Sequence, residues 1–86
     1  MKPIPALDEV VRELRSEIAL VTNSSPEKVD PEKSLAANGI DSMGFLEIIL
    51  FVKKTWGFDL IEGGMCAADF RNVNSLASVI ERAKAR

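Results

Sequence analysis

Residues 42–56 are apolar on almost every side of the helix that their spacing predicts. The apolar residues are Met43, Phe45, Leu46, Ile48, Ile49, Leu50, Phe51, Val52 and Trp56. We expect a core stripe made of Leu46, Ile49, Val52 and Trp56. Met43, Phe45 and Leu50 then fall nearer the outside. A helix this apolar lies at the centre of a bundle or presents part of its surface to a partner.

Two further segments show helical periodicity. The first runs over Leu7–Thr22 and should end near Asn23, before a Ser-Ser-Pro turn signal. Its apolar residues at helical spacing are Leu7, Val10, Val11, Leu14, Ile18 and Val21. The second is capped by Asn72 or Asn74 and reaches about Ala85. No segment alternates with period two, so we expect no sheet.

The segments between these helices complete the predicted fold. Residues 23–41 form a long connection, anchored by Val29 and Leu35. Gly57 ends the helix predicted over residues 42–56. Residues 65–70 add one or two helical turns that place Phe70 against the core. We therefore predict an all-α fold, a small four-helix bundle of three main helices and one short helix with a long first loop. The 86 residues form one domain with its core at about 7–83.

Composition excludes several classes of protein. The net charge of −2 and the pI of about 5.1 argue against a nucleic-acid binder, which usually carries a basic stripe. The single cysteine, Cys66, permits no disulfide framework within the chain. We interpret it as a small packed residue, and no metal-ligand spacing is present. The apolar run Ile48–Val52 is far shorter than the roughly 20 residues that span a bilayer. We expect a cytoplasmic monomer that does not enter a membrane.

The sequence Gly39-Ile40-Asp41-Ser42-Met43 places a serine at the opening of the second helix, beside a carboxylate suited to be its N-cap. The chain contains no histidine, so a serine–histidine mechanism is excluded. Lys53 and Lys54 lie about 16–18 Å along the helix at 1.5 Å per residue. We therefore predict that the chain is not an enzyme and that Ser42 is modified by another protein. The simpler alternative is that Asp41-Ser42 only caps the helix.

This pattern resembles the acyl carrier protein family, including its peptidyl carrier relatives. The five residues match the family's Gly-(Leu/Ile)-Asp-Ser-(Leu/Met) signature, and the resemblance extends over about residues 7–83. It implies that Ser42 carries a 4′-phosphopantetheine arm, attached from coenzyme A by a phosphopantetheinyl transferase with magnesium. The thiol of the arm would carry an acyl group as a thioester. Asp41 would orient the hydroxyl and the metal, and Met43 would contact the transferase.

Departures from the family pattern bear on its partners. Helix 2 of the family is usually acidic, whereas residues 41–57 have no net charge and Gly44 replaces a polar residue. We expect recognition along this helix to be more apolar than in the family, and we assign partner recognition to Met43, Phe45, Glu47, Leu50 and Ile61. The partners would be an acyl- or aminoacyl-activating ligase or acyltransferase, and downstream synthase enzymes of a dedicated or secondary-metabolic pathway.

Two alternatives to the acyl carrier stay open. One is an aminoacyl or peptidyl carrier loaded by an adenylating ligase. The segment Phe70-Arg71-Asn72 resembles that of discrete carrier proteins loaded by such a ligase. The other, from a different class, is a small helical interaction module without a prosthetic group. In that module Ser42 would serve only to cap its helix.

Overall fold

A computed structural model of the chain describes residues 3–62 and 70–83. These residues form α1 (Leu7–Thr22), the short 3-10 helix η1 (Pro26–Lys28), α2 (Ser42–Trp56) and α3 (Val73–Ala83). The described part contains no strand, only an isolated bridge between Ser34 and Asn72. The prediction of a small all-α protein is confirmed. The short helix expected at 65–70 falls almost wholly outside the described residues.

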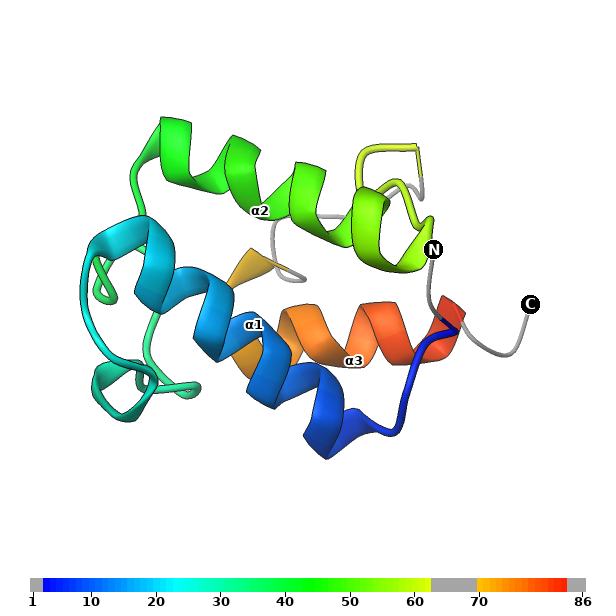
Figure 1. Cartoon of the computed structure of the whole chain (residues 1–86), viewed down its shortest axis with the longest axis horizontal. Helices are drawn as coiled ribbons and strands as arrows, with labels where there is room; N and C mark the ends of the chain where they lie inside the picture. The colour runs from blue at the N-terminus through cyan, green and yellow to red at the C-terminus, as the bar shows by residue number, and fades with distance from the viewer. Residues whose placement is uncertain (1–2, 63–69, 84–86) are drawn as a thin grey trace.

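The first helix packs against both of the others. Figure 1 shows that α1 runs in the direction opposite to α2 and α3, with its C-terminal end at the start of α2. The C-terminal end of α1 therefore lies beside the N-terminal end of α2. This arrangement brings Thr22 close to Gly39 and Val21 close to Gly44, the glycines on either side of the serine that opens α2.

Local signals end α1 and α2 where the sequence predicts, whereas the end predicted for the last helix, at about Ala85, lies outside the described residues. Asn23 adopts the left-handed conformation with φ of 57° after α1, and Gly57 does so with φ of 74° after α2. Both close the last turn by donating their backbone N–H to earlier carbonyls. At the start of α3, the Asn72 side chain accepts a hydrogen bond from the Ser75 N–H at 2.8 Å. Asn72, rather than Asn74, is thus the cap.

The core stripe predicted for α2 is wrong at Leu46, which is 50% exposed. The buried row is instead Gly44, Ile48, Val52 and Trp56, four residues apart, with Ile49 beside it. At 100° per residue, Leu46 lies on the far side of the helix from the middle of this row. On α1, Val10, Leu14 and Ile18 are fully buried as expected, whereas Leu7 at the first turn is exposed.

The connection between α1 and α2 is held in place by apolar anchors and by two side-chain amides. Val29 and Leu35 are buried, as predicted. Asn38 accepts a hydrogen bond from the Asp30 N–H and donates to the Asp30 carbonyl, both at 2.9 Å, and donates to the Ser34 carbonyl at 3.1 Å. Asn72 donates to the Glu32 carbonyl at 3.2 Å. These bonds hold the connection against the start of α3 and fix its approach to Ser42.

Candidate functional site

Asp41 begins α2 as its N-cap. Its backbone is extended, and its Oδ1 accepts a hydrogen bond from the Gly44 N–H at 2.8 Å. Its carbonyl oxygen accepts the Phe45 N–H, also at 2.8 Å. The predicted cap is confirmed, and it makes Ser42 the first residue of the helix. One orphan N–H of the first turn is thereby satisfied by a side chain.

The last turn of α1 packs closely against two glycines, one on each side of Ser42. Gly39 has φ of 92°, and a Cβ added there would lie 3.3 Å from the Thr22 Cγ2. A Cβ on Gly44 would lie 3.1 Å from the Val21 Cγ1 and 3.3 Å from the Asp41 Oδ1. Both glycines therefore permit close approach, and Gly39 also permits the positive φ. The turn is positioned by packing on both sides of the serine.

Ser42 itself is exposed. Among the described residues, none forms a hydrogen bond or ion pair with its hydroxyl. The first N–H groups of a helix lack intrahelical partners, and the helix dipole favours negative charge at this end. The site can therefore accept a phosphate ester on Ser42, but no side chain in contact with it could activate the hydroxyl. The described residues also contain no cluster of potential ligands that could hold a metal ion.

Large apolar side chains lie exposed along α2 from Ser42 onward. Met43 is 71% exposed, Leu46 50% and Leu50 61%, and their i, i+3, i+7 spacing makes one stripe. Glu47 is exposed beside them. Sequence reasoning placed Leu46 in the core and so missed one member of this stripe. Its three-residue spacing from Met43 was the available signal.

Phe45, predicted as a recognition residue, points away from this stripe. It is half-buried and packs against the core. Its ring meets the ring of Phe70 edge-on, with centroids 4.8 Å apart and planes at 77°. Phe70 therefore contacts the core region as expected. Phe45 supports the first turn of α2 from inside.

Ile61, the remaining predicted recognition residue, is 67% exposed on the turn after α2. Asp59 organises this turn, since its Oδ1 accepts the N–H groups of Ile61 and Glu62 at 3.0 and 3.1 Å. Its Oδ2 lies 3.5 Å from the Lys53 Nζ. The backbone bond from Glu62, then that from Ile61 and the ammonium of Lys53, lower the pKa of the Asp59 carboxyl. The turn thus keeps an ionised carboxylate at its centre.

Comparisons of the chain with protein-family models, with curated proteins and with solved structures gave no match. Within residues 3–62 and 70–83, no helix has the length and apolar character needed to cross a membrane.

Proposed function

We propose that the chain is an acyl carrier protein of the four-helix carrier fold, with Ser42 as the attachment site of a 4′-phosphopantetheine arm. The observation that carries the proposal is an exposed serine hydroxyl at the first position of α2, in a turn fixed by Asp41 and by two glycines. A carrier needs its attachment point accessible to several enzymes and rigidly placed on the bundle. A serine with a catalytic task of its own would need a neighbouring base.

The residues around Ser42 fit a phosphodiester. Its negative charge would lie at the helix N-terminus, where dipole and unpaired N–H groups favour an anion. The cap uses Oδ1 of Asp41, which leaves Oδ2 for the magnesium ion that a transferase brings with coenzyme A. The Ser42 oxygen would bond to phosphorus, the nucleotide half of coenzyme A would leave, and the transferase would take the hydroxyl proton. When bound, the arm supplies a thiol that carries acyl groups as thioesters.

The exposed stripe of Met43, Leu46 and Leu50, with Ile61 on the neighbouring turn, supports apolar recognition by the transferase and by the enzymes that load and use the arm. Residues 41–57 have no net charge, so long-range electrostatic steering contributes little along α2. This favours a dedicated set of partner enzymes. An aminoacyl or peptidyl carrier would use the same site, with an amino acid in place of the acyl group.

The test is to incubate the protein with coenzyme A, magnesium and a broad-specificity phosphopantetheinyl transferase, then measure its intact mass. We expect one phosphopantetheine adduct on the wild type and on the control Ser24→Ala, which removes another exposed serine. Ser42→Ala should gain none. An unmodified wild type, or an adduct that persists in Ser42→Ala, would leave the helical interaction module as the better account.

A further inference from the structure

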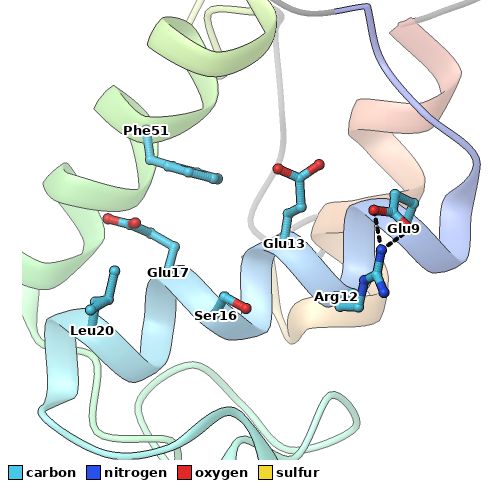
Figure 2. A pocket seen from close by; sticks show the side chains of 7 residues that line it. All are labelled: Glu9, Arg12, Glu13, Ser16, Glu17, Leu20 and Phe51. Atoms are coloured by element: carbon cyan, nitrogen blue, oxygen red, sulfur yellow. Dashed lines mark hydrogen bonds and ion pairs between the residues drawn. The ribbon is translucent and has the colours of Figure 1, made fainter.

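A groove lies between α1 and α2, and none of its lining residues belongs to the Ser42 turn. Its first part has a volume of about 430 Å³ and runs along α1 to Leu20. Figure 2 shows Phe51 projecting from α2 toward α1, with Glu13 and Glu17 extending from α1 toward it. A second hollow of about 330 Å³ shares Glu17 and Phe51 with the first and continues to Leu50. The two hollows adjoin at these shared residues and are together called the groove.

The walls of this groove expose large apolar side chains from both helices. Leu20 on α1 is 77% exposed and Leu50 on α2 is 61% exposed. Phe51 lies between them and is half-buried. Apolar groups gathered in a groove, rather than scattered singly, are typical of a surface that a partner covers.

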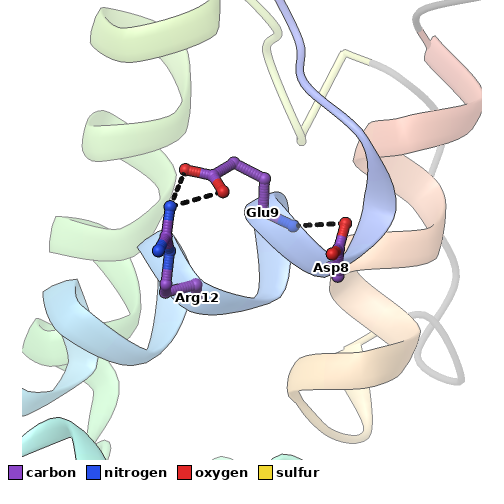
Figure 3. Close-up of polar contacts among 3 residues, drawn as sticks. All are labelled: Asp8, Glu9 and Arg12. Atoms are coloured by element: carbon purple, nitrogen blue, oxygen red, sulfur yellow. Dashed lines mark hydrogen bonds and ion pairs between the residues drawn. The ribbon is translucent and has the colours of Figure 1, made fainter.

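In the second hollow the two carboxylates, Glu17 and Glu47, outnumber the one cation. Burial raises the pKa of the Glu17 carboxyl, and the charge of Glu47 across the groove raises it further. Among the described residues, neither carboxylate has an ion-pair partner. Figure 3 shows that Glu9 holds the guanidinium of Arg12 at the other end of α1. The cation that lines the hollow beside Glu17 and Glu47 is Lys54, one turn beyond Leu50.

We propose that this groove docks a cationic amphipathic helix of a partner protein. Its apolar side chains would contact Leu20, Leu50 and Phe51, and a lysine or arginine would lie between Glu17 and Glu47. The backbone N–H and C=O groups of α1 and α2 are hydrogen-bonded within each helix. The groove walls therefore offer an extended peptide no backbone groups with which to pair. A helix satisfies its own backbone and fills such a groove with one apolar face. The proposal does not depend on modification of Ser42.

The test uses the full chain, labelled with ¹⁵N, and a synthetic helical peptide of about 18 residues, or five turns. The peptide has leucine along one face and lysine elsewhere, and its twin has glutamate in place of lysine. We expect the cationic peptide to shift amide signals of residues 13–20 and 47–54, and the twin to bind at least tenfold more weakly.

Two matched pairs of variants separate the groove from bulk charge and bulk hydrophobicity. Glu17→Gln with Glu47→Gln should weaken binding about tenfold, whereas Glu27→Gln with Glu32→Gln, which changes net charge equally at exposed sites outside the groove, should change it less than twofold. Leu20→Ser should weaken binding, and Ile61→Ser should not. Neutralising two facing carboxylates removes repulsion, so the groove variant should stay folded.

Several results would overturn the proposal. One is that both pairs of glutamine substitutions weaken binding equally, and another is that the glutamate peptide binds as tightly as the lysine peptide. The others are signal shifts confined to Met43 and Ile61, and no binding at millimolar peptide. Concentration-dependent shifts of the groove signals without peptide would show that a second copy of the chain occupies the groove instead.

Discussion

Replacing Asp41 by alanine tests whether the cap holds the turn that presents Ser42. The change removes the acceptor of the 2.8 Å bond from the Gly44 N–H. Loss of an N-cap costs about 1 kcal/mol, within a range of about 0.5–2. Loss of the negative charge at the helix N-terminus adds about 0.3–1 kcal/mol. We therefore expect Asp41→Ala to lose about 1–3 kcal/mol of unfolding free energy.

Two comparisons divide this loss into its parts. Asp41→Asn keeps an acceptor oxygen and loses only the charge, so it should cost about 0.3–1 kcal/mol. Asp8→Ala removes a first-turn charge from α1, where the Glu9 N–H that it binds also donates to the Ala6 carbonyl. It should therefore cost no more than Asp41→Asn.

The assay is urea unfolding followed by circular dichroism, with melting temperature as a second readout. For a domain of this size, 1 kcal/mol shifts the melting temperature by about 4–8 °C. Asp41→Ala should thus melt about 4–24 °C below the wild type. Equal stability of all three variants would refute the reasoning, because the bond to Gly44 would then contribute nothing beyond charge.

Three further predictions follow from the contacts around the site. Asn38→Ala removes bonds to both backbone groups of Asp30, and should lower the unfolding free energy by about 2 kcal/mol in urea; an unchanged midpoint would contradict its role. Gly39→Ala places a side chain at φ of 92° against Thr22 and should lower the unfolding free energy by about 1–3 kcal/mol, measured by thermal melting. An unchanged melting temperature would contradict this expectation. In the folded state the pKa of Glu17 lies above its ordinary 4.5, so between the pKa of the unfolded state and that of the folded state the folded protein binds the proton more tightly. The stability that Glu17 contributes is therefore lost as pH rises through this interval. Glu17→Gln should therefore stabilise the protein at pH 7 by up to about 0.5 kcal/mol, with no gain near pH 3; the opposite pH dependence, measured by urea midpoints, would refute the assignment.

Signals for the helix ends are local, and for that reason the sequence predicts them well. Asp41, Asn23 and Gly57 act through their own backbone or through groups a few residues away. The same holds for the anchors Val29 and Leu35, which stand alone among polar neighbours and are buried. Such features need no knowledge of the tertiary packing.

The face that α2 buries could not be predicted without the tertiary packing. Two apolar stripes run along this helix, and composition cannot say which one is buried. Gly44 decides, because its missing Cβ lets Val21 of α1 approach the buried row and turns Leu46 outward. The groove between α1 and α2 could not be predicted either, since Glu17 and Glu47 meet only when the helices pack.

The measurement that tests the carrier proposal most directly is fragment-ion mapping of the protein after incubation with coenzyme A, magnesium and a phosphopantetheinyl transferase. The account predicts a phosphopantetheine mass on Ser42 and on no other serine, because Ser42 alone opens α2 behind the Asp41 cap. A mass located on another serine, or none on a folded protein, would contradict it.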